Sequence, residues 1–141
     1  MKKIAIALLF LVSLSAASVF AQHDAQEAYE KGVEYDERGN KDKALEYYTK
    51  AIGMDPNHFD AHSNRGLIYL SRDQYDKAIA DFTLAIKLNP DSANAYYNRG
   101  LSSFYMERYD QAIADFSRSI ELDPAHPDRS STPSGGTGFN G

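Results

Sequence analysis

The sequence contains no cysteine among its 141 residues, which excludes disulfide bonds, zinc sites built on thiolates and catalysis by a thiol nucleophile. It is also short of positive charge, since 15 Lys and Arg side chains stand against 20 Asp and Glu, for a formal net charge of −5. Nucleic-acid binding relies on clustered Lys and Arg that neutralise phosphates. The chain has no basic stripe of that kind, so we expect no nucleic-acid partner.

The motifs of common enzyme sites are missing as well. There is no Gly-rich phosphate loop, no Gly-x-Ser-x-Gly elbow and no His-Glu-x-x-His. His58 and His62 lie four residues apart with Asp60 between them, but no third ligand has suitable spacing, so we expect both to be surface histidines. Asp81 and Asp115 recur at the spacing of the repeat described below and are expected on solvated faces. We therefore expect no enzyme, no cofactor and no metal site.

The first 21 residues have the three-part pattern of a secretory signal. A basic start at residues 1–3 precedes an apolar run over residues 4–12, and the small residues Val19 and Ala21 suit cleavage before Gln22. An uncleaved anchor is the alternative, because residues 4–21 are nearly long enough to cross a bilayer. Three serines in the second half of the segment and the processing site argue against it. The segment looks bacterial, so we expect a protein exported to a periplasm or outside the cell, with no membrane span after removal of the signal.

A 34-residue unit occurs three times in succession without a gap. The copies occupy residues 25–58, 59–92 and 93–126, and a fixed period of this size indicates stacked supersecondary units. In each copy, apolar residues recur at helical spacing on both sides of a polar turn, which predicts a helical hairpin. The predicted fold is an all-α solenoid of three helix-turn-helix repeats within residues 22–126. A Gly-, Ser- and Pro-rich tail follows at residues 127–141 and is expected to be disordered.

Two sets of residues mark fixed places in each copy. Pro56 and its two equivalents follow Asp or Asn, a pair that predicts the end of one helix and a proline in the first position of the next. Glycine recurs in the middle of each first helix, where it costs about 1 kcal/mol relative to alanine, so a neighbouring helix is expected to approach too closely for a side chain. The glycines are Gly32, Gly66 and Gly100; we expect Ala44, Ala78 and Ala112 to face them, with Tyr48, Phe82 and Phe116 beside.

This arrangement resembles the tetratricopeptide repeat family over residues 25–126. The period, the glycine, the Tyr-Asp-x-Ala-Ile run at residues 75–79 and 109–113, and the closing proline all match. The family's usual leucine before the glycine is Lys31, Arg65 or Arg99 here, which we expect to loosen the packing. The resemblance implies a non-enzymatic protein-interaction module in which the first helices of successive repeats line a concave groove for an extended or helical peptide.

Mapped through the repeat, this groove is expected to be acidic at the first copy, with Glu30 and Asp36, and aromatic at the third. A ligand with a basic end and an apolar end would suit it. The Asn64 and Asn98 amides could hold a peptide backbone, because an amide both donates and accepts, or they could be ordinary residues of the fold. The residues predicted to line the groove are Tyr29, Val33, Asn64, Leu67, Asn94, Tyr97, Asn98, Leu101, Phe104 and Tyr105.

Two further expectations concern the partner. Some members of the family hold chaperone C-terminal carboxylates with Lys and Arg from these helices, but here only Asn64 matches, so that activity is not expected. Solenoids normally end in a polar capping helix, and none follows residue 126 in the sequence. Ile113, Phe116 and Ile120 would then leave part of an apolar face unfilled. The alternative function is therefore a structural or oligomerising unit that associates through this end.

Overall fold

Six helices make up the described part of the chain, and no strand occurs among residues 2–125. A computed structural model describes the backbone of these residues and the side chains of residues 19–125, so the predicted tail at residues 127–141 lies outside it. The helices are α1 (Lys2–Glu37), α2 (Lys41–Met54), α3 (Phe59–Ser71), α4 (Tyr75–Leu88), α5 (Ala93–Tyr105) and α6 (Tyr109–Leu122). The predicted all-α fold is confirmed.

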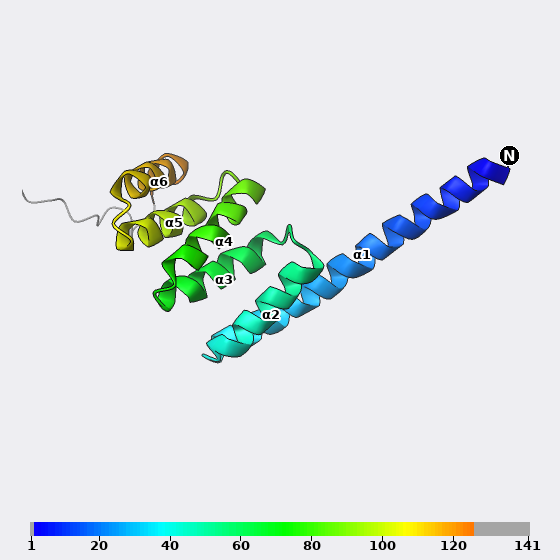
Figure 1. Cartoon of the computed structure of the whole chain (residues 1–141), viewed down its shortest axis with the longest axis horizontal. Coiled ribbons are helices and arrows are strands. Elements are labelled where there is room, and N and C mark those ends of the chain that lie inside the picture. The colour runs from blue at the N-terminus through cyan, green and yellow to red at the C-terminus, as the bar shows by residue number, and fades with distance from the viewer. Residues whose placement is uncertain (1, 126–141) are drawn as a thin grey trace, which may run out of the picture.

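The helices pair into hairpins that stack one beside the next (Figure 1). Within the hairpins α1 packs on α2, α3 on α4 and α5 on α6, while α2 with α3 and α4 with α5 join successive hairpins. The core crosses from one hairpin to the next, because Ala28 and Ala51 of the first pack with Ala61 of the second, and Ala44 and Tyr48 pack with Ile68. Six helices in this order fit a solenoid of about three repeats.

The segment predicted as a secretory signal is continuous with the first helix of the array. α1 runs from Lys2 to Glu37 without a break, and its N-terminal part extends away from the hairpins (Figure 1). Over the residues that the structure describes, none of the helices combines the length and the hydropathy that a membrane span needs. Cleavage before Gln22 stays a prediction.

The turns between hairpins differ from the prediction in one respect. Asp55 ends α2, and its carboxylate accepts a hydrogen bond at 2.9 Å from the backbone N–H two residues on, with Pro56 between them. α3 begins only after His58, whose Nδ1 accepts the backbone N–H three residues further on at 3.3 Å. Asn89 and Ser92 repeat both contacts one copy later. The expected proline in the first helical position is therefore wrong, because the turn that Asp55 closes holds the proline outside the helix.

Close approach at the mid-helix glycines is confirmed, but aromatic rings rather than alanines face them. A Cβ added to Gly32 would lie 2.6 Å from the Tyr48 ring, and one added to Gly66 would lie 2.9 Å from the Phe82 ring. Gly100 faces Phe116 in the same way at 3.0 Å. A ring reaches across the gap between the two helices of a hairpin, so it takes the space that a side chain at the glycine would need.

Two arginines form buried ion pairs that the sequence analysis did not anticipate. Arg65 on α3 donates from Nε and Nη2 to the Asp81 carboxylate on α4, at 2.8 Å each. Arg99 and Asp115 form the same two-pronged pair at 2.8 and 2.7 Å one repeat later. The expectation of solvated carboxylates is wrong for Asp81 and Asp115, both buried. Instead of loosening the packing, the arginines tie the two helices of their hairpins together.

Each of these arginines also contacts the preceding hairpin. Nη1 of Arg65 donates to the Thr49 hydroxyl on α2 at 3.1 Å, and Nη1 of Arg99 donates to Thr83 on α4 at 3.3 Å. In the first copy, Lys31 stands in the place of the arginine and Tyr47 in the place of its aspartate partner. Lys31 pairs with Glu27 on its own helix at 2.8 Å instead.

His62 completes the network around Asp81. The prediction of a surface histidine is wrong here, because His62 is only 2% exposed. Its Nδ1 lies 3.1 Å from Asp81 Oδ1, and its Nε2 lies 3.0 Å from the Pro56 carbonyl oxygen, so neither nitrogen is available to a metal. Burial acts to raise the pKa of the Asp81 carboxyl, but hydrogen bonds from Arg65 and His62 outweigh it and hold the pKa below its usual value.

Candidate functional site

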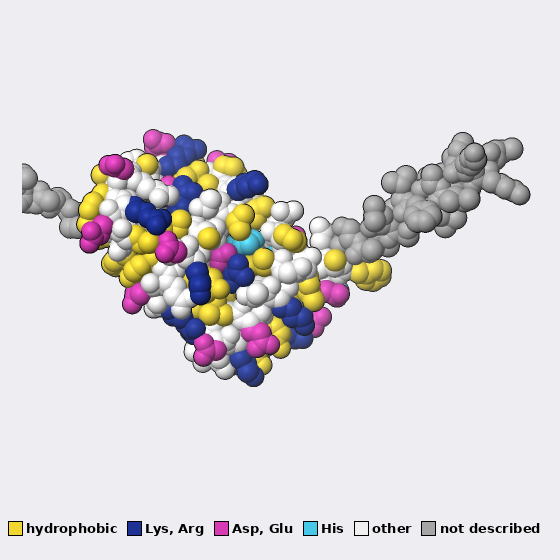
Figure 2. Space-filling view, viewed as in Figure 1, with side chains coloured by type: hydrophobic (Ala, Val, Ile, Leu, Met, Phe, Trp, Pro, Cys, Tyr) yellow, Lys and Arg dark blue, Asp and Glu magenta, His cyan; other side chains and the backbone are white. Residues whose placement is uncertain are grey.

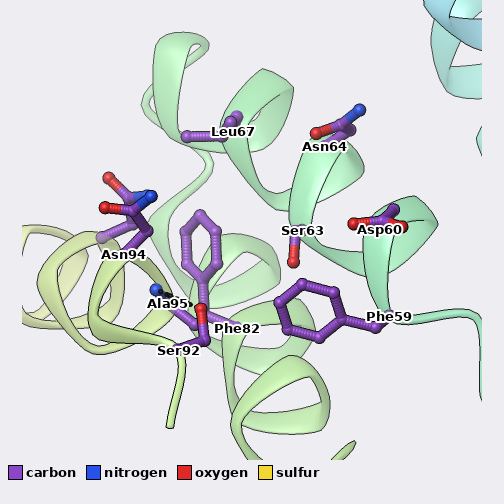
Figure 3. A pocket seen from close by; sticks show the side chains of 10 residues that line it. Phe59, Asp60, Ser63, Asn64, Leu67, Phe82, Ser92, Asn94 and Ala95 are labelled. Carbon is purple, nitrogen blue, oxygen red and sulfur yellow. Dashed lines mark hydrogen bonds between the residues drawn. The ribbon is translucent and has the colours of Figure 1, made fainter. Parts of the chain in front are cut away.

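A groove of about 240 Å³ lies between α3 and α5. Its base is the buried ring of Phe82 on α4, which lies between the two helices in Figure 3. We call it the α3–α5 groove, and its lining residues are Phe59, Asp60, Ser63, Asn64, Leu67, Phe82, Ser92, Asn94, Ala95 and Asn98.

Helical spacing places the polar rim of this groove. Asp60, Asn64 and Leu67 are separated by four and three residues, so they share one side of α3. Asn94 and Asn98 occupy the places of Asp60 and Asn64 one repeat later, on α5. The rim therefore carries amides from both helices, and Leu67, at 44% exposure, adds an apolar side chain that solvent can reach.

Four of the ten predicted residues meet in the α3–α5 groove, namely Asn64, Leu67, Asn94 and Asn98. The half-buried Tyr29 and Val33 pack on core residues of the first two hairpins. The half-buried Tyr97 lies against the Phe116 ring, with centroids 5.6 Å apart, and Leu101 is half-buried on α5. Sequence reasoning treated Phe82 only as a spacer beside Gly66, although its repeat position on the second helix could have indicated that it closes the groove from below.

The last two predicted residues belong to an exposed aromatic cluster at the end of α5. Phe104 and Tyr105 are both exposed, and the Phe104 ring lies 5.8 Å from the Tyr109 ring on α6. Tyr105 stacks on Tyr75 of α4 with ring centroids 5.2 Å apart. The cluster lies at the α5–α6 turn, outside the α3–α5 groove, so it extends the apolar surface of the third repeat rather than lining the groove itself.

The Asn64 amide is already engaged on one side. Its Nδ2 donates to the hydroxyls of Tyr29 and Tyr48, at 3.2 and 3.4 Å. Figure 3 shows its oxygen turned toward the groove and its nitrogen turned away. Burial raises the pKa of Tyr48 to about 12, and burial, together with the Asp60 carboxylate, raises that of Tyr29. Both hydroxyls are therefore neutral at physiological pH, and Asn64 faces the groove as a hydrogen-bond acceptor.

The charges on the outer surface are mixed. On the face seen in Figure 2, Lys and Arg side chains lie between Asp and Glu, and they form no continuous basic stripe there.

The chemistry that the groove offers is amide hydrogen bonding beside a small apolar surface. This combination suits the backbone and one apolar side chain of a peptide.

Comparison with known proteins is consistent with this geometry. Two models of the tetratricopeptide repeat match the chain, at residues 29–93 and 66–132. An uncharacterised protein of Methanocaldococcus jannaschii is 46% identical over 43 residues, which are 30% of this chain and 50% of that protein. The chain thus spans about half the length of the curated relative that it matches.

Solved structures extend the likeness to most of the array. The first TPR domain of Spaghetti (RPAP3), bound to the HSP90 peptide SRMEEVD, is 30% identical with a TM-score of 0.74, over 77% of this chain and 86% of that one. The first TPR domain of human RPAP3 is 31% identical with a TM-score of 0.71, over 77% of this chain and 86% of that one. The Arabidopsis OM64 TPR domain is 25% identical with a TM-score of 0.74, over 78% of this chain and 91% of that one. Repeat sequence, stacked hairpins and these matches agree, and the chain belongs to the tetratricopeptide repeat family.

Proposed function

We propose that this protein is a non-enzymatic interaction module that binds a peptide or helical segment of a partner protein in the α3–α5 groove. The observation that carries the proposal is the pairing of amides on both rims with an exposed Leu67 above the Phe82 ring. The similar domain of Spaghetti (RPAP3) was solved with an HSP90 peptide bound, which supports peptide binding by this fold. The side chains that would contact the peptide are this chain's own.

Replacing Leu67 with asparagine is expected to weaken peptide binding about tenfold. The substitution removes the apolar contact that a ligand side chain would bury, worth about 1.5 kcal/mol for a partly exposed leucine. The measurement is isothermal titration with dodecamers selected from a displayed random library on the full chain.

Leu84→Asn is the matched control for this experiment. Leu84 is 42% exposed against 44% for Leu67, but it lies on α4 and does not line the groove. Its replacement is expected to leave the affinity unchanged. If no dodecamer is enriched on the wild-type chain, or if both substitutions weaken binding equally, the groove is not the binding site.

Self-association through α6 is a second candidate function, favoured by two exposed isoleucines. Ile113 is 64% exposed and Ile120 is 44% exposed, and exposed apolar side chains of this kind often mark contacts. We expect sedimentation velocity to show a fraction of dimer that increases with protein concentration. This fraction should be lost in the Ile113→Ser, Ile120→Ser double variant. Phe116 is left unchanged because it packs on Gly100. A wild-type monomer at every concentration would remove this candidate.

A further inference from the structure

We propose that the α3–α5 groove selects peptide segments that carry Lys or Arg, with the basic side chain beside Asp60 and an apolar side chain over Leu67. The inference rests on the proposed function and names its class of partner.

The positive charges on α1, α3 and α5, the first helices of the three hairpins, are all engaged within the molecule. Between residue 19 and the end of α5, the Lys and Arg on α1, α3 and α5 are Lys31, Arg65 and Arg99. Lys31 pairs with Glu27 at 2.8 Å. The two arginines make the two-pronged pairs with buried carboxylates described above. None of the three lines the groove, so no cation of these helices faces a ligand there.

The negative charges on the same helices are only partly paired. Asp60 is the one charged residue among those that line the groove, and its carboxylate has no ion pair with any described residue. Its charge reaches the hydroxyl cluster behind the rim, since it contributes to the raised pKa of Tyr29. Glu30 accepts a hydrogen bond from Gln26 at 3.0 Å but likewise has no described ion-pair partner, whereas Asp36 pairs with Lys41.

The distribution of these carboxylates gives the groove a direction. Glu30 occupies on α1 the place that Asn64 has on α3 and Asn98 has on α5. α5 carries no Asp or Glu, and ends in the exposed Phe104 and Tyr105. Negative potential therefore lies on the α1–α3 side and apolar surface on the α5 side. By charge complementarity, the basic part of a ligand belongs beside Asp60 and its apolar part toward the third repeat.

The peptide bound to the similar Spaghetti (RPAP3) domain illustrates the contrast. Its sequence, SRMEEVD, contains one arginine but three acidic residues, so its net charge is negative. In the groove described here, acidic residues would face the unpaired Asp60 carboxylate without any arginine or lysine free to meet them. Like charges placed beside one another lower the affinity and slow the association of a ligand. The two proteins therefore share the fold, while the ligand charge preferred here is opposite to that of the HSP90 peptide.

The test is selection of displayed random dodecamers on the full chain, followed by sequencing and titration of the enriched peptides. We expect Lys and Arg to be enriched over Asp and Glu. Asp60→Asn should weaken the best peptide about three- to fivefold, as for an exposed ion pair, and Asp60→Lys should weaken it further. The loss should shrink as salt is raised, because salt screens exposed charges.

Asp110→Asn is the matched control. Asp110 holds the same second position in α6 that Asp60 holds in α3, so both substitutions remove one exposed first-turn carboxylate. The control should leave affinity unchanged. Enriched peptides without a basic bias, or equal losses for the two substitutions, would overturn this inference while peptide binding stands. Absence of any enriched peptide would instead overturn the proposed function itself, and the inference with it.

Discussion

Replacing Asp81 with alanine is expected to lower the free energy of unfolding by about 3–5 kcal/mol, because it leaves buried partners without their counter-charge. Asp81 holds two nitrogens of Arg65 at 2.8 Å and Nδ1 of His62 at 3.1 Å. An alanine satisfies none of them. Urea unfolding followed by circular dichroism measures the loss.

Asp115→Ala tests the same pair in a different setting. Asp115 is held by Arg99 alone among the hydrogen bonds resolved around it, since Tyr96 stands in the place of His62. We expect a smaller loss, by roughly the 1–2 kcal/mol of one hydrogen bond to a charged group. Equal losses at the two sites would show that His62 adds nothing to the stability of the second repeat.

The effect of Asp81 should also depend on pH. Its folded-state pKa lies below the usual value, so the carboxylate stabilises the fold above the unfolded-state pKa of about 3.9 and loses this effect as pH falls through the folded-state pKa. The difference in stability between the wild type and Asp81→Asn should therefore be constant near neutral pH and shrink below about pH 4. A difference that grows in acid would contradict the assignment.

Replacing Phe82 with alanine is the second large effect, and we again expect a loss of about 3–5 kcal/mol. The ring is 1% exposed and occupies the space beside Gly66. Its removal leaves a cavity between α3 and α4 and takes away the base of the α3–α5 groove. Thermal unfolding reports the loss of stability.

A second substitution shows whether the ring and the glycine fit one another. Gly66→Ala alone should destabilise by about 1–3 kcal/mol, because its methyl group would lie 2.9 Å from the Phe82 ring. In the Phe82→Ala background the same change should stabilise, since the space is open and alanine favours a helix by about 1 kcal/mol. Gly53→Ala on α2 is the control, with no atom within 4 Å of the added carbon, and should stabilise in both backgrounds. Additive effects of the two changes would refute the close fit.

The sequence predicted the fold well because a period of 34 residues constrains every copy at once. Mid-helix glycines were sufficient to predict close approach, since their cost requires a packing reason. Whether an aromatic ring or an alanine methyl group faces each glycine was not predictable, because this depends on the distance between the two helices.

Buried charge was the main failure, and the repeat held a signal that could have revealed it. Arg65 and Asp81 are 16 residues apart, as are Arg99 and Asp115, while the first copy lacks both members, with Lys31 and Tyr47 in their places. Two residues that are present together or absent together in successive copies indicate contact. Each alone reads as an ordinary surface charge, which explains the wrong expectation.

The candidate site was predictable in part. Four of the predicted residues, Asn64, Leu67, Asn94 and Asn98, line one groove between α3 and α5, because the repeat puts them at matching places on the two helices; that they bind a peptide stays a prediction. The sequence did not predict that the Asn64 amide nitrogen is already engaged. It donates to the hydroxyls of Tyr29 and Tyr48, which lie 35 and 16 residues away in the sequence. Such contacts depend on how successive hairpins are stacked.

The guanidinium groups of Arg65 and Arg99 have a consequence for the length of the array. Each is a rigid planar fork that bonds to a carboxylate in its own hairpin and to a threonine hydroxyl in the one before. The fork thereby links adjacent hairpins through the same pair of groups at both joints, at 3.1 and 3.3 Å. The middle unit carries both groups, Arg65 and Thr83, so a duplicate of that unit inserted at either joint would remake the same contact on each side, and the array could lengthen by gene duplication with the same kind of joint throughout.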